Sequence, residues 1–355
     1  MAPNKSIIFQ KTVDEVPIPG THLSIEDRPI DLSLPPPDGG LLLKNYYLSV
    51  DPYMRTRMEA RFPKFYVSFF DVGEPIHNGG VAKVLKSRNP KFAEGDVVYF
   101  FNDKGLPFQE YTVCDAAMAE IPFKVENPYN VDVRHYVGAL GLAGLTAYGS
   151  LYEIGKPKAG ETILVSAASG AVGQLVGQLA KKEGLRVLGS VGSDEKLKYI
   201  VDELGFDGGF NYKTEEPRKA LKRLALNGVD IYYDNVGGPL LEAALGEMNL
   251  FGRVVSSGMI CDYNKQPENR YGVKSLRAIY MRRITFQGFI CIDENILKHF
   301  PAMQEAIGKG LADGSIKFKQ DITVGIENAI GAFLDLLNGG NNGKALVQLA
   351  DLDVD

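Results

Sequence analysis

Cysteine, basic charge and long apolar runs are all scarce in this sequence of 355 residues. Its three cysteines, Cys114, Cys261 and Cys291, form no CxxC pair, which argues against a disulfide framework and against a zinc ribbon. The net charge of −5 and the pI of about 5.6 provide no basic field for nucleic acid. No apolar run approaches the ~20 residues of a membrane span, and the N-terminal segment lacks the apolar core of a signal peptide. We therefore expect a cytoplasmic protein that binds neither nucleic acid nor membrane.

The residues of metal and serine catalysis are also missing. A catalytic zinc needs three protein ligands, and we cannot assemble them from the four histidines, His22, His77, His135 and His299, because no cysteine occurs in the first 113 residues. His77 lies in a glycine-rich stretch but is followed by Asn78 rather than Glu, and no GxSxG motif occurs. We predict no metal site, so any electrophile must be activated by hydroxyl or amide donors.

The pattern of strand-like and helix-like segments changes near residue 130. The first ~125 residues contain short β-type runs separated by turns, such as 41–50, 79–87, 96–101 and 108–113. Beyond residue 130, strand-like and helix-like segments alternate, which favours a parallel sheet covered by helices. Near the C-terminus, residues 322–340 read as a helix that ends at a glycine pair. The strand KALVQL follows, and it has no obvious place in the parallel sheet and could return to the first module.

The stretch 162–182, TILVSAASGAVGQLVGQLAKK, combines a strand, a glycine turn and a helix. TILV is typical of a buried parallel strand, and the apolar spacing after the turn predicts a helix that ends near Gly184. Gly170 and Gly173 have the spacing of the dinucleotide fingerprint GxGxxG, with Ala168 in the first glycine position. Gly170 would let a pyrophosphate approach the backbone, and Gly173 would let the helix pack closely on the strand. The alternative is a tight turn with nothing bound.

The end of the next strand, RVLGSV (186–191), bears on the choice of nucleotide. An NAD site places an Asp or Glu there to accept from the ribose 2′-hydroxyl, whereas here Gly192 and Ser193 follow the strand. A small neutral tip leaves room for a 2′-phosphate, and Lys196 offers a counter-charge. This favours NADP(H). Alternatively, Ser193 or Asp194 merely caps the next helix and Lys196 is solvated.

Nearly the whole chain resembles the medium-chain dehydrogenase/reductase superfamily, and more narrowly its zinc-free enone reductases: prostaglandin reductases, alkenal reductases and plant double-bond reductases. The matching stretches are LSVDPYMRTRM (48–58), GGVAKVLKS (79–87), LGLAGLTAYGSL (140–151), VSAASGAVGQLVGQLAK (165–181), GSDEK (192–196), GFNYK (209–213), YYDNVGG (232–238), FGRVVSSGMICDYN (251–264), RRITFQGFI (282–290) and NGGNNGK (338–344). The resemblance implies an α/β fold. Residues 1–130 and 318–355 would form a GroES-like β-rich substrate domain, and residues 131–317 a Rossmann NADP-binding domain with a doubly wound parallel sheet.

The resemblance also implies which residues contact NADP(H). At the pyrophosphate would lie Gly170, Ala171, Val172 and Gly173. Around the 2′-phosphate would lie Gly192, Lys196 and Tyr212. The rest of the cofactor would contact Asn235, Gly258, Met259, Ile260, Tyr263, Phe289, Ile290 and Asn341. Tyr263 also matches the tyrosine that lies near the substrate carbonyl in such families, which makes it a candidate catalytic residue.

Three further features bear on the substrate pocket. Tyr53, in DPYMR, is a second candidate catalytic residue, or else it packs in the core beside Pro52. Plant members often carry a pocket tyrosine where this chain has Gly79, so plant-type substrate preferences do not transfer. The aromatic loop RFPKFYVSFF (61–70) would either cover a bulky enone as a hydrophobic lid or serve in domain packing.

The expected reaction is NADPH-dependent reduction of the carbon–carbon double bond of an α,β-unsaturated ketone or aldehyde, a small hydrophobic substrate. A hydride would reach the β-carbon, and tyrosine and ribose hydroxyls would stabilise the resulting enolate without a metal. The alternatives are an NADPH quinone reductase on the same fold and a non-catalytic NADPH-binding protein. The absent ligands argue against a zinc alcohol dehydrogenase. Since members of such families are often dimers, we expect a homodimer.

Overall fold

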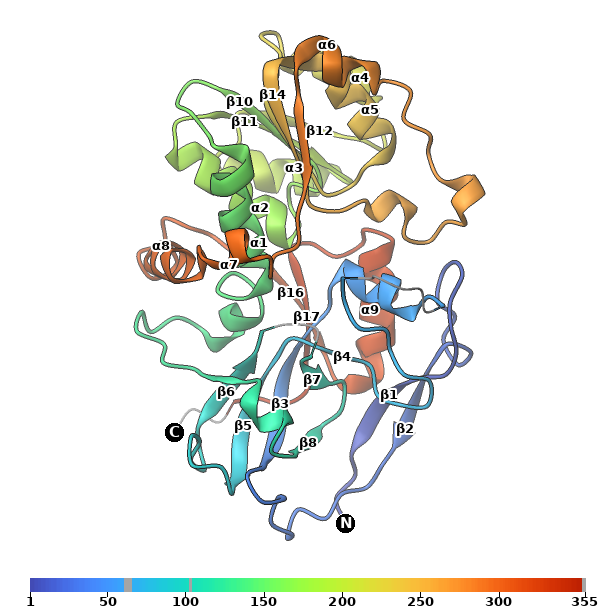
Figure 1. The fold of residues 1–355 in the computed structure, drawn as a ribbon, viewed down its shortest axis with the longest axis vertical. Coiled ribbons are helices and arrows are strands. Elements are labelled where there is room, and N and C mark those ends of the chain that lie inside the picture. Colours follow the sequence, from blue (N-terminus) through green and yellow to red (C-terminus); the bar gives the residue numbers. More distant parts are fainter. Residues whose placement is uncertain (61–65, 102–103, 353–355) are drawn as a thin grey trace. The chain divides into compact units, whose positions relative to one another are not determined.

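A computed structural model describes residues 1–60, 66–101 and 104–352 of the chain. The chain divides into a β-rich unit, residues 1–142 and 320–355, and a parallel-sheet unit, residues 143–319 (Figure 1). The predicted boundaries at 130/131 and 317/318 fall earlier in the sequence. Residues 131–142 belong to the β-rich unit because the short helix η3 (Val133–Val137) packs against strands of its sheet. Within the described residues, no helix has the length and apolar character needed to span a membrane.

The parallel-sheet unit is built on six parallel strands, all within the fully described residues 143–319. They are β10 (Thr162–Val165), β11 (Arg186–Val191), β12 (Gly208–Asn211), β13 (Val229–Asp234), β14 (Met248–Ser256) and β15 (Thr285–Gly288). Their order across the sheet is β12-β11-β10-β13-β14-β15. This is the 3-2-1-4-5-6 order of the doubly wound dinucleotide-binding fold. The chain therefore winds outward in one direction from β10 and in the other from β13, and these two strands are neighbours.

The helices of this unit precede, connect or follow its strands. They are α1 (Leu142–Ser150), α2 (Ala171–Lys182), α3 (Asp194–Lys198), α4 (Pro217–Leu224), α5 (Gly238–Glu247), α6 (Arg277–Arg282), α7 (Glu294–Leu297) and α8 (Phe300–Ala312), with the π-helical segments η4 (Leu151–Gly155) and η5 (Tyr199–Glu203) continuing α1 and α3. Helix α2 ends where predicted, with Gly184 at a φ of 77°. Helix α5 stops at Glu247 because Met248 pairs with Val229 and begins β14.

The β-rich unit contains a mixed sheet with the order β16-β17-β3-β5-β6-β9, and β8 pairs with β3. Its strands are β3 (Leu41–Ser49), β5 (Gly80–Ser87), β6 (Val97–Phe100), β8 (Tyr111–Cys114), β9 (Phe123–Lys124), β16 (Gln320–Val324) and β17 (Lys344–Gln348), and two small antiparallel pairs join β1 (Lys5–Phe9) to β2 (Leu23–Asp27) and β4 (His77–Asn78) to β7 (Leu106–Pro107). The C-terminal strand β17 runs antiparallel to β3, with Val347 opposite Leu48. The last strand therefore does return to the first module.

The predicted helix at 322–340 is partly wrong. Its first residues, including the β-branched Ile322, Thr323 and Val324, form β16 and pair in parallel with β17. Gly325 then adopts a φ of 87°, and helix α9 covers only Ala329–Leu337. The β-branched residues favour the strand over the helix, and the sheet edge completes it.

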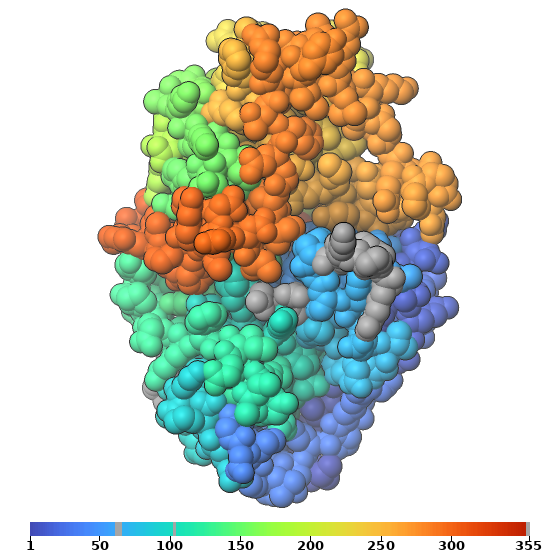
Figure 2. Space-filling view, viewed as in Figure 1, coloured from blue at the N-terminus to red at the C-terminus, as the bar shows by residue number. Residues whose placement is uncertain are grey.

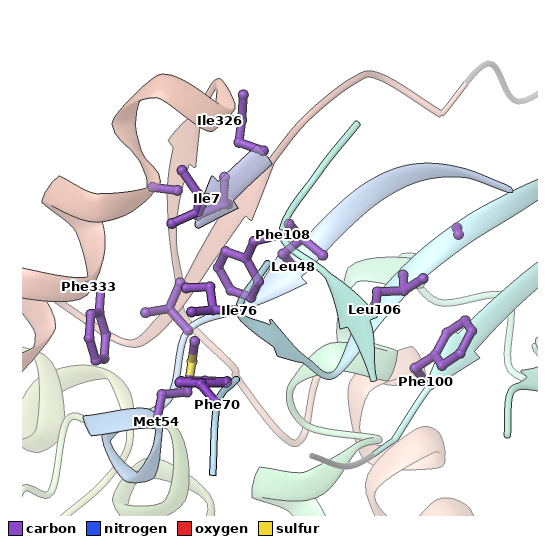
Figure 3. Close-up of a cluster of buried hydrophobic side chains, with 14 of the residues drawn as sticks. Ile7, Leu48, Met54, Phe70, Ile76, Phe100, Leu106, Phe108, Ile326 and Phe333 are labelled. Carbon is purple, nitrogen blue, oxygen red and sulfur yellow. The ribbon is translucent and has the colours of Figure 1, made fainter. Parts of the chain in front are cut away.

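The core of the β-rich unit joins both ends of the chain. Ile7 from β1, Met54 from helix η1 (Pro52–Met58) and Phe333 from α9 belong to one cluster of buried side chains (Figure 3). Burying each such side chain contributes roughly 1.5–3 kcal/mol. The cluster therefore fixes η1 and the C-terminal segment in the same small volume, where the polar side chains described below meet.

Candidate functional site

Strands β10 and β13 mark the point where the winding of the parallel sheet reverses. The segment after β10 is tied to the segment after β13 by Asn235, whose backbone N–H donates to Ser166 Oγ (2.7 Å) and whose Nδ2 donates to Ser166 O (2.7 Å). In open α/β sheets, ligands bind outside the carboxyl ends of the strands at this switch point. The residues that follow the strand ends are therefore the candidate site.

The glycine turn after β10 has the geometry of a phosphate site. A Cβ added to Gly173 would lie 2.4 Å from Ala167 O and 2.8 Å from Ala168 Cα, so only glycine fits there. Gly170 is the N-cap of α2, and Gln174 N makes the bond to Gly170 O (3.0 Å) that starts the helical ladder. The N–H groups of residues 171–173 precede that bond and point out of the positive end of the helix, as an anion requires.

The tips of β11 and β12 bring Gly192, Lys196 and Tyr212 close together. A Cβ on Gly192 would lie 3.0 Å from the Tyr212 hydroxyl oxygen. Ser193 does cap α3, accepting from Lys196 N at 3.2 Å, but the Lys196 side chain is not solvated, since the residue is only 8% exposed. Asp194 accepts from Asn211 Nδ2 (2.9 Å), which draws this carboxylate toward β12. A lysine and a tyrosine hydroxyl, the kinds of group that bind a 2′-phosphate, therefore follow the ends of these two neighbouring strands.

The loop after β14 carries Tyr263 at the end of the turn η6 (Ile260–Asp262). Gly258 N donates to Asp234 O (3.1 Å) and Cys261 N to Val236 O (3.2 Å), so this loop is fastened to the end of β13. A Cβ on Gly258 would lie 3.1 Å from the Tyr263 hydroxyl oxygen. The hydroxyl therefore lies over the backbone of Gly258, at the same sheet edge as the glycine turn.

The remaining predicted residues of this unit lie at the same edge. Met259 and Ile260 belong to the loop just described, and Met259 is 37% exposed. Phe289 and Ile290 directly follow β15 and are half-buried, with Ile290 N donating to Asp293 Oδ2 (2.8 Å). Every predicted cofactor residue between 170 and 290 therefore follows the carboxyl end of a strand in one parallel sheet.

Asp234, the last residue of β13, holds the following turn in place through hydrogen bonds, a role that was not predicted from the sequence. Its Oδ1 accepts from the Tyr232 hydroxyl (2.8 Å), Gly237 N (2.8 Å) and Val236 N (3.0 Å). Burial raises the pKa of Asp234, and these hydrogen bonds oppose the rise. The side chain holds the 234–237 turn to which the Tyr263 loop is fastened. Asp234 lies within the motif YYDNVGG, but the spacing of that motif does not distinguish a residue that supports the turn from one that contacts a ligand.

Two predicted residues, Tyr53 and Asn341, belong to the β-rich unit. Tyr53 is half-buried in η1, and its hydroxyl bonds to Asn78 Oδ1. Asn341 donates from Nδ2 to Gly343 O (2.7 Å) in the turn before β17. Gly79, beside Asn78, has little space for a side chain, because its Cβ would lie 3.1 Å from Phe100 O.

Arg57 of η1, which sequence reasoning missed, is fully buried. Its guanidinium donates to His77 O (2.6 Å), contacts His77 Nε2 (2.7 Å) and lies 4.1 Å from the centre of the Phe70 ring. His77 is therefore a structural partner of an arginine. Among the described residues, no three His, Cys, Asp or Glu side chains are grouped to hold a metal.

The aromatic loop 61–70 is described in part. Phe62 and Phe65 lie outside the described residues. Phe70 is buried in the core, 5.9 Å from Phe9 between ring centres, which is the packing alternative, whereas Tyr66 is 41% exposed. Phe69 is half-buried.

Comparison with known proteins places the chain among the reductases. Residues 5–121 match the profile of the N-terminal domain of oxidoreductase, and residues 171–307 that of the zinc-binding dehydrogenases. The chain is 47% identical over 356 residues to the NADP-dependent oxidoreductase RED1 of Cochliobolus heterostrophus, covering 100% of both chains. It is 40% identical over 348 residues to a 2-alkenal reductase (NADP(+)-dependent) of Nicotiana tabacum, covering 98% of both.

A solved structure is similar to this chain over almost its whole length. CurA of Vibrio vulnificus in complex with NADPH is 32% identical, with a TM-score of 0.86 over 98% of this chain and 99% of that chain. The α/β fold and the NADP(H) cofactor predicted from the sequence are thus confirmed, and the protein is an oxidoreductase. The chain belongs to the NADP-dependent enone and alkenal reductase family of the medium-chain dehydrogenases/reductases.

Proposed function

We propose that this enzyme reduces the carbon–carbon double bond of α,β-unsaturated ketones and aldehydes. The relative named as a 2-alkenal reductase supports this substrate class. The observation that carries the proposal is the Tyr263 hydroxyl, which lies over Gly258 at the sheet edge that also presents the glycine turn. A hydroxyl donor and a nucleotide site at one edge are what conjugate reduction requires.

The cofactor contacts follow from the geometry of that edge. The N–H groups of Ala171, Val172 and Gly173 would bind the pyrophosphate, with Gly170 admitting it to the backbone, and Gly192, Lys196 and Tyr212 would enclose the 2′-phosphate. The rest of the nucleotide would contact Asn235, Gly258, Met259, Ile260, Tyr263, Phe289 and Ile290. Asn341 is a further proposed contact. When bound, NADPH supplies the hydride that goes to the β-carbon of the substrate.

Tyr263 would act on the other end of the conjugated system. As the β-carbon gains a hydride, the electron pair of the double bond moves to the α-carbon and negative charge develops on the carbonyl oxygen. The Tyr263 O–H, together with a ribose hydroxyl, would donate hydrogen bonds to that oxygen, worth about 3 kcal/mol per donor. The α-carbon would then take a proton from solvent. The steps proposed here use hydroxyl donors alone, and the described part of the chain groups no three His, Cys, Asp or Glu side chains.

We further propose a cytoplasmic homodimer, formed through the outer edge of the parallel sheet. Within the described chain, β15 pairs only with β14, and three of its four residues are exposed. Helix α6, which precedes β15 in sequence and packs against β14, lies in the orange segment of Figure 2. Its Tyr280 (69%) and Met281 (49%) are exposed. An edge strand beside exposed apolar side chains is a template for strand pairing. Light scattering should give twice the chain mass of 38.8 kDa, and the chain mass itself would contradict the dimer.

Steady-state kinetics test the reaction. NADPH oxidation should be fast with a simple alkenal and with an aryl enone, and slower with quinones. Tyr263→Phe should lower kcat on the enone at least about tenfold, while the Kd for NADPH, measured by fluorescence, stays within twofold. A quinone preferred over every enone would refute the substrate class, and an unchanged kcat in Tyr263→Phe would remove Tyr263 from the mechanism.

A further inference from the structure

Beneath Tyr53 lies a buried polar chain that connects distant parts of the β-rich unit. Lys344, at the start of β17, has a side chain that is 2% exposed and donates to Val50 O (2.7 Å), Asp51 Oδ1 (3.0 Å) and Ala345 O (3.0 Å). All three protons of its ammonium group therefore have acceptors. Burial lowers the pKa of Lys344, and Asp51 beside it acts in the opposite direction.

Asp51 connects Lys344 to Asn78 through hydrogen bonds. Its Oδ1 accepts from Lys344, and its Oδ2 accepts from Asn78 Nδ2 (2.9 Å) and from the Ser49 hydroxyl. Asn78, in β4, is 1% exposed, and its Nδ2 also donates to the backbone O of Ser49 (2.9 Å). Asn78 thus has two acceptors on the same side of its amide.

The orientation of the Asn78 amide follows from these partners. A backbone carbonyl and a carboxylate bound to an ammonium group accept hydrogen bonds and donate none. The amide nitrogen must therefore face Ser49 and Asp51, and the amide oxygen must face Tyr53. Since that oxygen can only accept, the bond between Tyr53 and Asn78 has a single direction: Tyr53 donates its proton.

We propose that Lys344, through Asp51 and Asn78, fixes the Tyr53 hydroxyl as an inward donor, so that Tyr53 meets a substrate only as a hydrogen-bond acceptor. Tyr53 is then not a donor to the enolate oxygen. It determines specificity, favouring enones that carry a hydroxyl group of their own, and Lys344, Asp51 and Asn78 are positioning residues. This inference rests on the proposed enone reduction.

The kinetic test uses Tyr53→Phe, which removes only the hydroxyl of a half-buried ring. The substrates are aryl enones with a hydroxyl at the ortho, meta or para position, each matched with the fluoro compound, which has similar size and donates nothing. The wild type should prefer at least one hydroxyl compound about fivefold in kcat/KM, as expected for a neutral hydrogen bond. In Tyr53→Phe this preference should fall to about one, while kcat on the unsubstituted enone changes less than threefold.

Two results would overturn the inference. A tenfold loss of kcat on the unsubstituted enone in Tyr53→Phe would mean that Tyr53 donates to the reacting oxygen. If the wild type showed no preference for hydroxyl compounds, or if the preference persisted in Tyr53→Phe, then Tyr53 would not accept a hydrogen bond from the substrate. If the wild type reduced no enone at all, the proposed function would fail instead, and the direction of the Tyr53 bond would be tested without turnover.

That second measurement is NMR of protein labelled with ¹³C at tyrosine Cζ, in half-deuterated water. The Tyr53 signal, assigned by its loss in Tyr53→Phe, should be split by slow exchange of a bonded hydroxyl proton. Lys344→Met, which removes the ammonium group that orients Asp51, should merge the two lines. A single averaged line in the folded wild type would contradict an inward-donating hydroxyl, whether or not the Lys344 variant folds.

Discussion

The two units of this enzyme build their candidate sites in different ways. In the parallel-sheet unit, the groups expected to bind the cofactor are backbone N–H groups and glycines, set by contacts such as that of Gly173 with Ala167, six residues away. In the β-rich unit, Tyr53 is held by side chains, and the bond from Lys344 to Asp51 spans 293 residues. A site made of backbone groups can be recognised from one short sequence motif. A network of side chains from distant positions forms only when the chain has folded.

The largest expected effect is on the reaction rates of two cysteine thiols, one from each unit. Burial raises the pKa of Cys114, in the β-rich unit, and of Cys261, in the Tyr263 loop, from an ordinary 9.0 to about 12. At pH 8 each thiol should react with iodoacetamide about 1,000-fold more slowly than free cysteine, because the thiolate is the reactive species. The rates should rise about tenfold per pH unit up to about pH 12, as measured by peptide mass spectrometry.

The comparison of the two thiols tests how open the Tyr263 loop is, because Cys261 is half-buried whereas Cys114 is fully buried. If Cys261 reacted at the rate of an exposed thiol while Cys114 did not, the loop that carries Tyr263 would be more open than its bonds to the end of β13 indicate.

The next effect tests whether the parallel-sheet site depends on backbone shape. Gly173→Ala should lower the free energy of unfolding by ~2 kcal/mol, because the added Cβ would lie 2.4 Å from Ala167 O. NADPH binding, measured by fluorescence titration, should be lost along with it. Gly246→Ala in α5 is the matched control, since a Cβ there meets nothing within 4 Å, and it should stabilise the helix by about 0.5 kcal/mol. Equal effects at both glycines would refute the close-packing role of Gly173.

A smaller effect concerns Lys196, the one charged side chain expected at the cofactor. Lys196→Ala should raise the Kd for NADPH at least about tenfold and leave the Kd for NADH within twofold, because only NADPH carries the 2′-phosphate. Lys198, exposed on the same helix, provides the control Lys198→Ala, for which both values should be unchanged. An equal loss for both nucleotides would show that Lys196 supports the fold rather than the phosphate.

The same contrast explains what the sequence could predict. The turn at 166–173, the strand–helix alternation and the NADP preference depend on residues close in sequence, and these predictions agree with the structure or with the relatives. The helix expected at 322–325 was wrong because a strand forms there against β17. The buried Arg57 and Lys344 were visible in DPYMRTRM and NGGNNGK, but no periodicity distinguishes a buried cation from a solvated one. Their partners come from elsewhere in the chain.

The most direct test of the account is the fate of the cofactor's hydrogen. The enzyme would be supplied with NADPH carrying deuterium at both C4 positions and with an aryl enone in ordinary water, and the product examined by ²H and ¹H NMR. We predict a saturated ketone with one deuterium on the β-carbon and a proton from solvent on the α-carbon. Deuterium on the carbonyl carbon of an allylic alcohol, or a product without deuterium, would contradict conjugate reduction by this enzyme.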